Sequence, residues 1–589
     1  MYTPLKNYQI IISLLKQNNI KHLVLSAGTR NIPFVQSVEN DPYFKCYSVV
    51  DERSAAYMAL GISLRLNEPV VISCTSSTAT CNYFPAIAEA YHQGGQLIVL
   101  TSDRNPALLD QREDQMINQV NMYGTFVKKA VNLPIINTDE DFWHCQRLVN
   151  EAILATNHHG KGPVQINIPM LNYSTICSEK SCLTAKKINR ICIEDKKYWD
   201  DKVKELASKK RIMVICGQNN YVSPLLNELL TKFCKKYHAV LIAEYMANIE
   251  CEEAINPFLP FDGHVLSQDS FKKYTPDLVI GLGGNVMSGI KEQLRLQQNN
   301  FEHWGIEPSG EIIDMYKSLT NVFECSPEYF FNYFLSQEIS TKEENKHYQD
   351  LIRQYISNIK LCEVSFSNNT VIRDFIKNIP NHSILHLSIN NSIRLVNYYG
   401  LPNRSIKVYA NIGTHGIDGC LSSYIGQAIT SDELSFLIIG DLSFFYDMGA
   451  MRIRHIPPTA RILMINNFGG GEFHYSTTLE RDPTMDLHTS AAHQTKAELW
   501  VKSVGFKYFG VHNEEEYQVA LTDFMNKNIQ QPIFIEVFSD MEIDATGTHT
   551  LEYNNLQITT KEAIKRKLKK TITNTIGNSN ISKLKSIMK

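Results

Sequence analysis

Short runs of apolar residues alternate with longer amphipathic stretches through most of the chain. In roughly the first 170 residues the apolar runs predict buried strands. These are HLVLSA from His22, CYSVV from Cys46, PVVISCT from Pro69, QLIVLTSD from Gln96 and VQINIP from Val164. The segments between them, such as ERSAAYMALGISLRL, have the longer apolar repeat of a helix. Strand–helix alternation of this kind predicts a parallel sheet with helices on both faces.

The same alternation occurs twice more, after polar stretches that begin at Ser178 and Ser336. Eight further strands are predicted: RIMVICG from Arg211, AVLIAE from Ala239, DLVIGLGG from Asp277, SILHLS from Ser383, KVYAN from Lys407, LSFLIIGD from Leu434, ARILMINN from Ala460 and PIFIEVF from Pro532. The predicted fold class is therefore α/β, with three doubly wound parallel-sheet domains. We place them at residues 1–178, 195–340 and 360–545.

Composition narrows the class of protein without naming a function. With 589 residues the chain has room for three or four domains, and its 43% hydrophobic and 20% charged residues are ordinary for a globular protein. No apolar run approaches the ~18 residues of a membrane span. The amino terminus lacks a basic start and a cleavage site, so no secretory signal is predicted. The 13 cysteines form no C-x-x-C pair, which favours a reducing, cytoplasmic location over a zinc or redox site.

The net charge of −3 conceals a basic tail, which we place at residues 560–589. From Lys561 to Lys589 there are nine Lys or Arg residues and one acid, a local charge of +8, so the remaining 560 residues carry −11. We expect a solvated or partner-docked tail, with contact to anionic lipid as the alternative. Nucleic-acid binding is not expected, because the tail has no aromatic residue to stack on bases.

Polar residues follow two of the strands predicted in the third domain. Asp441 ends LSFLIIGD, and Asn467 ends ARILMINN just before the turn at 468–471, which holds three glycines. In parallel sheets ligands bind beyond the carboxyl ends of strands, and an acid, an amide and backbone carbonyls suit Mg²⁺ beside a diphosphate. The alternative is that these are ordinary turn residues. Asp51-Glu52 likewise precedes a predicted helix, where a helix N-cap is the simpler interpretation.

Together these signals resemble the thiamine-diphosphate enzymes. Asp441 and Asn467, with 25 residues between them, are similar to that superfamily's metal–diphosphate motif. Within it the chain resembles the menaquinone-pathway (MenD-type) 2-succinyl-5-enolpyruvyl-6-hydroxy-3-cyclohexene-1-carboxylate synthases over about residues 5–545. The segments that carry the resemblance are 26–30 (SAGTR), 51–53 (DER), 75–79 (TSSTA), 100–104 (LTSDR), 416–419 (GIDG) and 440–443 (GDLS).

The resemblance implies thiamine diphosphate and Mg²⁺ as cofactors. Glu52 would hydrogen-bond the aminopyrimidine ring, and Ile417 would support the bent form of the cofactor. Asp441, Asn467 and the carbonyl of Gly469 would bind the metal. Further cofactor contacts are expected from Asn391, Ser392, Gly440, Leu442 and Ser443.

The resemblance also implies substrate residues and an assembly. Arg30, Arg104 and Gln115 would handle substrate carboxylates and the reacting intermediate, since an Arg fork meets a carboxylate through two hydrogen bonds. Further substrate contacts are expected from Thr29, Phe473 and His474, and His474 is a candidate for proton transfer. Because the family's active sites lie between subunits, a homodimer or homotetramer is expected.

The chain departs from the family pattern mainly where substrate would bind. Ile412 stands where the family has Arg, and Ser288-Gly289-Ile290, with Lys291 just beyond, replaces a basic pair. Val396 stands near the place of another Arg; Arg394 is close, but on a helix it would point about 200° away. Two further changes are Glu472 in place of an apolar residue and Ser77 in place of a glycine.

These departures affect specificity more than activation of the cofactor. Each lost charge-assisted contact costs about 1.5–3 kcal/mol, which argues against isochorismate and 2-oxoglutarate as the natural substrates. The predicted function is a thiamine-diphosphate-dependent transferase or lyase that decarboxylates a 2-oxo acid and transfers the acyl carbanion to an acceptor. The alternatives are a simple 2-oxo acid decarboxylase and a non-catalytic cofactor-binding subunit.

Overall fold

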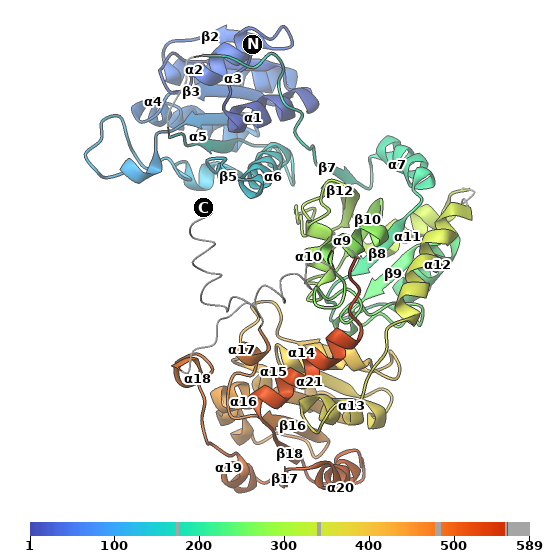
Figure 1. Cartoon of the computed structure of the whole chain (residues 1–589). Helices are drawn as coiled ribbons and strands as arrows, with labels where there is room; N and C mark the ends of the chain where they lie inside the picture. Colours follow the sequence, from blue (N-terminus) through green and yellow to red (C-terminus); the bar gives the residue numbers. More distant parts are fainter. Residues whose placement is uncertain (172–175, 339–342, 477–483, 560–561, 563–589) are drawn as a thin grey trace, which may run out of the picture. The chain divides into compact units, whose positions relative to one another are not determined.

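The computed structural model describes residues 1–171, 176–338, 343–476, 484–559 and 562 (Figure 1). It divides into two compact units, residues 1–192 with 310–322 and residues 193–309 with 323–589, and each is described by itself. Three six-stranded sheets with interspersed helices confirm the predicted α/β class. The predicted basic tail lies outside the described residues except for Glu562.

The first sheet has the strand order β2-β1-β3-β4-β6-β5, and its strands pair in parallel. Its strands are β1 (His22–Leu25), β2 (Lys45–Ser48), β3 (Val70–Cys74), β4 (Leu97–Ser102), β5 (Lys129–Asn132) and β6 (Val164–Ile168). The helices are α1 (Lys6–Gln17), α2 (Ile32–Glu39), α3 (Glu52–Leu66), α4 (Thr78–Asn82), α5 (Phe84–Gln93) and α6 (Asp139–Ala155), with 3-10 turns η1 (Pro106–Leu108) and η2 (Gly124–Phe126). Every residue of β3, β4 and β6 is buried, as expected for strands covered on both faces.

The second sheet has the order β7-β12-β11-β10-β8-β9. Its strands are β7 (Asn189–Cys192), β8 (Ile212–Cys216), β9 (Val240–Ala243), β10 (Leu278–Leu282), β11 (Glu302–Ile306) and β12 (Leu319–Glu324). Its helices are α7 (Lys196–Ser208), α8 (Pro224–Tyr237), α9 (Gln268–Phe271), α10 (Ile290–Arg295), α11 (Pro327–Ser336) and α12 (Glu343–Ser357), with 3-10 turns η3 (Tyr245–Ala247) and η4 (Lys272–Tyr274). Only β8, β9 and β10 of these strands were predicted from the apolar runs.

The third sheet has the order β14-β13-β15-β16-β18-β17. Its strands are β13 (Ile384–Leu387), β14 (Lys407–Ala410), β15 (Ser435–Gly440), β16 (Ala460–Asn466), β17 (Lys507–Val511) and β18 (Ile533–Phe538). Its helices are α13 (Asn368–Asn378), α14 (Asn391–Tyr399), α15 (Cys420–Ile429), α16 (Asp441–Asp447), α17 (Glu472–Tyr475), α18 (Thr484–His488), α19 (Glu498–Ser503), α20 (Glu514–Phe524) and α21 (Met541–Asn554), with the 3-10 turn η5 (Met448–Arg452).

The topology of the third sheet brings several loops to one edge. Strand β15 pairs in parallel with β13 on one side and with β16 on the other, so the carboxyl ends of all three lie together. The chain winds outward from β13 to β14 and then in the opposite direction from β15, which makes the β13–β15 boundary a topological switch point. Ligands of open parallel sheets bind at such a point.

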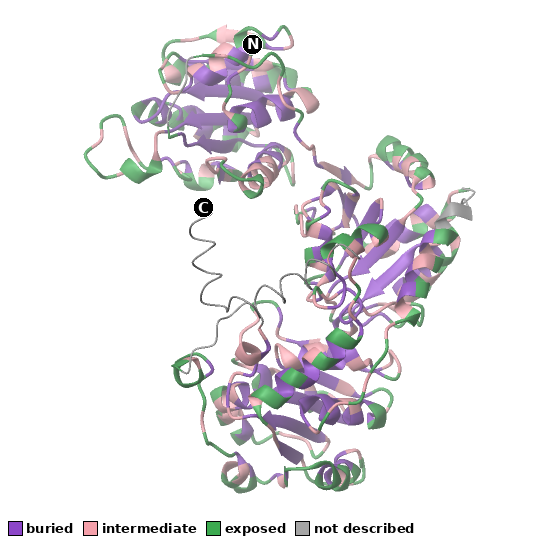
Figure 2. Cartoon of the chain, viewed as in Figure 1, coloured by how far each residue is buried: buried purple, intermediate pink, exposed green. Residues whose placement is uncertain are grey.

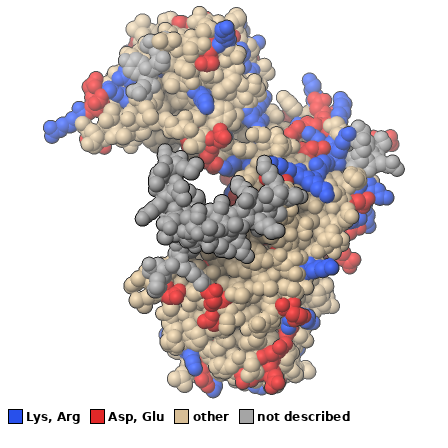
Figure 3. All heavy atoms as spheres, viewed as in Figure 1, with Lys and Arg blue, Asp and Glu red and all other residues tan. Residues whose placement is uncertain are grey.

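Figure 2 shows the strands of the sheets as mostly buried, while the helices between them have one buried and one exposed face. On the face drawn in Figure 3, acidic and basic side chains of the described residues are interspersed. None of the described helices is long and apolar enough to cross a membrane. None of the 13 cysteines forms a disulfide.

Candidate active site

A cavity of about 110 Å³ lies at the carboxyl ends of β13, β15 and β16, and we call it the strand-end cavity. It is lined by residues 388–392, 440–443 and 469–472, together with Ile417 and several apolar side chains. Eight of the residues expected to hold cofactor or metal line it: Asn391, Ser392, Ile417, Gly440, Asp441, Leu442, Ser443 and Gly469. The cavity therefore forms from loops that are far apart in the sequence.

The buried carboxylate of Asp441 is fixed at the floor of this cavity. Its Oδ1 accepts a hydrogen bond of 2.6 Å from the amide of Leu442, and its Oδ2 accepts one of 2.9 Å from the amide of Gly469. His493 Nε2 lies 3.3 Å from the same Oδ2. Asp441 thus links the start of α16 to the glycine-rich turn after β16, and it is held in one orientation.

The amide of Asn467 is oriented by a buried carboxylate on α21. Its Nδ2 donates a 2.9 Å hydrogen bond to Asp544 Oδ2, which turns the amide oxygen away from Asp544. Asp544 also accepts hydrogen bonds from the amide of Asn368 and the hydroxyl of Ser539. Burial raises the pKa of Asp544 to about 6. Asp544 was not predicted, because it lies 77 residues beyond Asn467 on a helix without a motif.

The turn after β16 fits a bound anion and cation. A Cβ added at Gly471 would lie 2.8 Å from Asn467 Nδ2, and one added at Gly469 would lie 2.9 Å from the carbonyl of Ser490. Only glycine leaves this space open at both positions. A carboxylate, an amide oxygen and a backbone carbonyl are hard oxygen donors of the kind that Mg²⁺ takes beside phosphates. The donor set therefore fits a metal-bound diphosphate.

On the other side of the cavity, the hydroxyl of Ser443 donates a hydrogen bond to the carbonyl of Ile417. The hydroxyl of Ser388 in turn donates to Ser443 Oγ over 3.1 Å. These bonds fix the backbone that carries the Ile417 side chain into the cavity. The predicted support residue is therefore held rigidly beside the predicted metal site.

Five of the predicted residues lie in the first unit: Thr29, Arg30, Glu52, Arg104 and Gln115. Glu52 is the first residue of α3, and Asp51 caps the helix by accepting hydrogen bonds from the amide of Arg53 and the hydroxyl of Ser54. The capping interpretation is therefore correct for Asp51, while Glu52 lies half-buried just inside the helix. The amide of Arg30 donates to Thr75 Oγ1 over 3.2 Å, and Thr29 next to it is exposed.

Arg104 follows β4, and within this unit its charge is already matched. Its guanidinium forms ion pairs with Glu113 and with Asp114, the latter at 3.1 Å, and also donates to the carbonyl of Asp114. Gln115 is exposed and has a φ of 53°, and its carbonyl accepts a hydrogen bond from Ser76. The loop after β4 therefore carries two of the predicted substrate residues, Arg104 and Gln115.

Phe473 and His474 lie on α17, directly after the glycine-rich turn. Phe473 is half-buried, and its ring would lie 3.0 Å from a Cβ added at Gly470. His474 Nε2 lies 2.7 Å from Asp486 Oδ1, and its Nδ1 lies 3.5 Å from Glu542 Oε2. His474 thus lies between two carboxylates near the strand-end cavity.

A second cavity of about 270 Å³, which we call the side cavity, adjoins the strand-end cavity. Asn390 lines both cavities. Arg394 also lines the side cavity. Its long side chain reaches Glu472, with hydrogen bonds of 2.9 and 2.8 Å, and its guanidinium carbon lies 3.9 Å from the centre of the Tyr475 ring.

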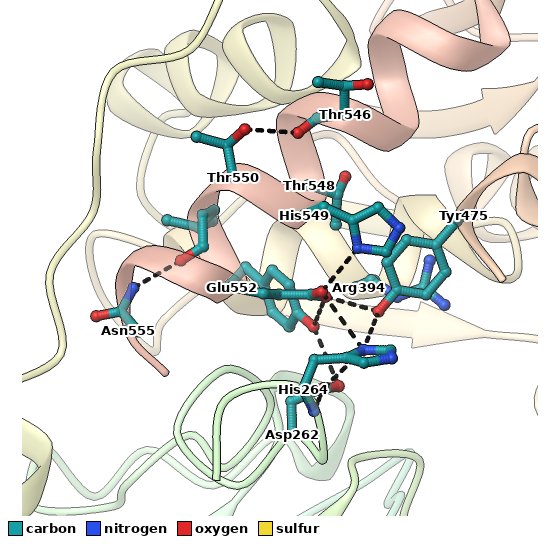
Figure 4. Close-up of polar contacts among 12 residues, drawn as sticks. Asp262, His264, Arg394, Tyr475, Thr546, Thr548, His549, Thr550, Glu552 and Asn555 are labelled. Atoms are coloured by element: carbon teal, nitrogen blue, oxygen red, sulfur yellow. Dashed lines mark hydrogen bonds and ion pairs between the residues drawn. The ribbon is translucent and has the colours of Figure 1, made fainter. Parts of the chain in front are cut away.

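A polar cluster supports this wall of the side cavity. Figure 4 shows Asp262, His264, Tyr475 and Glu552 pointing toward one another. The fully buried Glu552 accepts a 2.6 Å hydrogen bond from Tyr475, and His264 Nδ1 lies 3.2 Å from Asp262 and 3.4 Å from Glu552. A hydrogen bond to Asp262 raises the pKa of His264 despite its burial. No sequence motif indicated this cluster, because Asp262 and His264 lie in a loop of the second-sheet domain, whereas Tyr475 and Glu552 lie on helices of the third-sheet domain.

Comparison with known proteins agrees with this geometry. Residues 6–122 match the family "Thiamine pyrophosphate enzyme, N-terminal TPP binding domain". The chain is 38% identical to the 2-succinyl-5-enolpyruvyl-6-hydroxy-3-cyclohexene-1-carboxylate synthase of Bacteroides thetaiotaomicron, covering 92% of this chain and 98% of that protein. The synthases of Bacteroides fragilis and Phocaeicola vulgatus are each 36% identical, over 92% and 93% of this chain and 98% of each relative. The chain belongs to this synthase family.

Family membership confirms the predicted superfamily, and it makes the chain a thiamine-diphosphate-dependent enzyme of the carboligase type. Family membership alone does not assign roles to individual residues of this chain. The expected diphosphate and metal residues converge in the second unit, whereas Glu52, Arg30 and Arg104 belong to the first.

Proposed function

We propose that the chain binds thiamine diphosphate through a Mg²⁺ ion held by Asp441, Asn467 and the carbonyl of Gly469. It then decarboxylates a 2-oxo acid and joins the remaining acyl group to an acceptor. The observation that carries this proposal is that Asp441 and the glycine-rich turn line the strand-end cavity together. Asn467, which does not itself line the cavity, lies directly behind the turn, with its Nδ2 2.8 Å from a Cβ added at Gly471. The names of the relatives support carbon–carbon bond formation as the overall reaction.

Thiamine diphosphate, when bound, stabilises the carbanion that decarboxylation leaves behind. The bond between the carboxyl carbon and the 2-oxo carbon breaks, and carbon dioxide leaves. The electron pair stays on the former carbonyl carbon and forms the new bond to an electrophilic carbon of the acceptor. Glu52 would exchange a proton with a ring nitrogen of the pyrimidine. Arg30, Arg104 and Gln115 would orient the substrates, while Phe473 would exclude water and His474 would move a proton.

The same proposal includes a homodimer or homotetramer in the cytoplasm. The support for an oligomer is the family resemblance, which implies active sites between subunits. The support for a reducing compartment is that none of the 13 cysteines forms a disulfide. Light scattering on the purified chain tests the assembly, and a monomer that remains fully active would contradict it.

The decisive experiment is a panel of 2-oxo acids assayed for carbon dioxide release by the wild-type chain and by Glu52→Gln. We expect Glu52→Gln to lower turnover about 10²–10⁴-fold, the usual loss when an acid–base group is removed. Glu39→Gln, the same change at an exposed position of α2, is the matched control. Equal turnover by the wild type and Glu52→Gln would refute the proposal. Product analysis with and without acceptors separates carboligation from simple aldehyde release.

A further inference from the structure

The wall between the two cavities is an internal ion pair. Glu472 lines the strand-end cavity and Arg394 lines the side cavity, and the two side chains meet through two hydrogen bonds. Arg394 also donates to the side-chain oxygen of Asn391. One face of its guanidinium is covered by the ring of Tyr475. The charge of Arg394 and the end-on pair of N–H groups that an arginine offers to a carboxylate are therefore already used by Glu472.

Other charges around the side cavity are also unfavourable for a carboxylate. Asp262 lines it, and Glu552 lies directly behind His264 and Tyr475. With Glu472 this makes three carboxylates against one arginine, and the positive charge that His264 can carry lies against two of those acids. Lys291 is not among the residues that line the cavity. A second carboxylate on a substrate would have no unpaired cation to meet among these lining residues.

The side cavity does offer uncharged hydrogen-bonding groups. Nδ1 of His415 is buried and has no hydrogen-bond partner among the described atoms, while its Nε2 lies 3.3 Å from Asn390 Oδ1. Ser288, only 3% exposed, also lines the cavity. Ile412, whose side chain is buried, is not among the residues that line the cavity. Part of the lining of the side cavity therefore consists of uncharged hydrogen-bond donors and acceptors, where the family pattern has basic side chains.

We infer that the side cavity receives the end of the 2-oxo acid donor remote from its reacting carbon, and that this end is uncharged and hydrogen-bonding rather than a second carboxylate. The inference rests on the proposed function, because a donor must react in the adjoining strand-end cavity. Asn390, which lines both spaces, connects the two cavities. Glu472 occupies the position on Arg394 that a donor's second carboxylate would otherwise take.

The first test compares donors on the wild-type chain loaded with thiamine diphosphate and Mg²⁺. The probes are 2-oxoglutarate, its 5-methyl ester and 2-oxopentanoate, and the measurement is kcat/KM for carbon dioxide release. We expect both monocarboxylic donors to exceed 2-oxoglutarate at least about tenfold, the value of one charge-assisted contact. An equal or higher value for 2-oxoglutarate would overturn the inference.

The second test uses Glu472→Gln, which keeps the shape of the side chain but leaves the charge of Arg394 unmatched. We expect kcat/KM for 2-oxoglutarate to rise at least about tenfold relative to 2-oxopentanoate. Glu498→Gln, at a surface pair with Lys502, is the matched control and should leave the ratio unchanged. An unchanged ratio in a folded Glu472→Gln, checked by circular dichroism, would contradict the inference.

A double variant, Arg394→Met with Glu472→Met, covers the case in which Glu472→Gln does not fold. It removes both charges, so the preference for monocarboxylic donors should persist; its reversal would overturn the inference. Failure of the proposed function gives a different result. If no donor gives Glu52-dependent carbon dioxide release, both proposals fall, whereas Glu52-dependent release that favours 2-oxoglutarate removes only the inference about the side cavity.

Discussion

The two adjoining cavities of the second unit differ in the charged and polar residues that line them. The strand-end cavity has a carboxylate, an amide and glycines at the positions that the family resemblance predicts, and Asp441 is held by backbone amides. The side cavity is lined by one arginine, Arg394, which is already paired with Glu472, and not by the further cations of the family pattern. On the proposed function, the chemistry of the cofactor and the choice of substrate would be set by separate residues, which could change independently.

The largest expected effect concerns Asp441. Asp441→Ala removes a proposed metal ligand, so the affinity for thiamine diphosphate with Mg²⁺ should fall at least about a hundredfold, as calorimetry would show. At saturating cofactor the ratio of kcat/KM values for the donors should not change, because the side cavity is untouched. Asp432→Ala, at an exposed position, is the control. An altered donor ratio in Asp441→Ala would show that the two cavities are not independent.

The next effect concerns the support of the side cavity. Glu244 accepts hydrogen bonds from the amides of Met287 and Ser288, and burial raises its pKa from 4.5 to about 7. The folded chain binds this proton more tightly than the unfolded chain does. The resulting stability is complete below about pH 4.5 and is lost as the pH rises through about 7.

Glu244→Gln should therefore flatten the pH dependence of the free energy of unfolding, by on the order of 2 kcal/mol between pH 4.5 and 7. Thermal unfolding at a series of pH values measures it. The control is Glu250→Gln, whose side chain is about half exposed and which pairs with Lys407. A slope that remains as steep in Glu244→Gln as in the wild type would contradict the assignment.

A smaller effect is expected at Gly471, where a Cβ would approach Asn467 Nδ2 to 2.8 Å. Gly471→Ala should weaken cofactor binding about tenfold, since overpacking costs roughly 1–3 kcal/mol. Gly426→Ala is the matched control, because it lies exposed in α15 with no atom within 4 Å of the added Cβ. That change should leave cofactor binding alone and stabilise the helix by about 0.5–1 kcal/mol. Normal binding by Gly471→Ala would mean that the turn moves freely.

The contrast between the cavities also explains what the sequence could predict. Strands such as β15 and β16 are almost wholly apolar, and the polar residues after them stand out at once. Edge strands β5 and β17 have only one buried residue each and were missed. Burial alone does not explain this, because β2, which has no buried residue, was predicted. The strand-end cavity could therefore be predicted, since parallel pairing alone brings Asp441 and Asn467 to one edge of the sheet.

The side cavity could not be predicted in the same way. Arg394 and Glu472 are 78 residues apart, and their pairing depends on how α14 packs beside the glycine-rich turn. The angle of Arg394 on a helix does not reveal this partner, because a long flexible side chain reaches a carboxylate that only the tertiary structure supplies. The missing cations and Glu472 were visible in the sequence, but the pairing of Glu472 with Arg394 was not.

The smallest expected effect concerns Tyr475, and it distinguishes a hydroxyl that only stabilises the fold from one that contacts the substrate. Tyr475→Phe keeps the ring beside Arg394 but removes the hydroxyl that donates to the buried Glu552. Because Tyr398 still donates to Glu552, the free energy of unfolding should fall by only about 1 kcal/mol. Tyr446→Phe, at a residue that is 72% exposed, should leave stability unchanged. The donor preference should also persist in Tyr475→Phe, since the ion pair of Arg394 remains intact; a shift toward 2-oxoglutarate would mean that this hydroxyl itself reads the substrate.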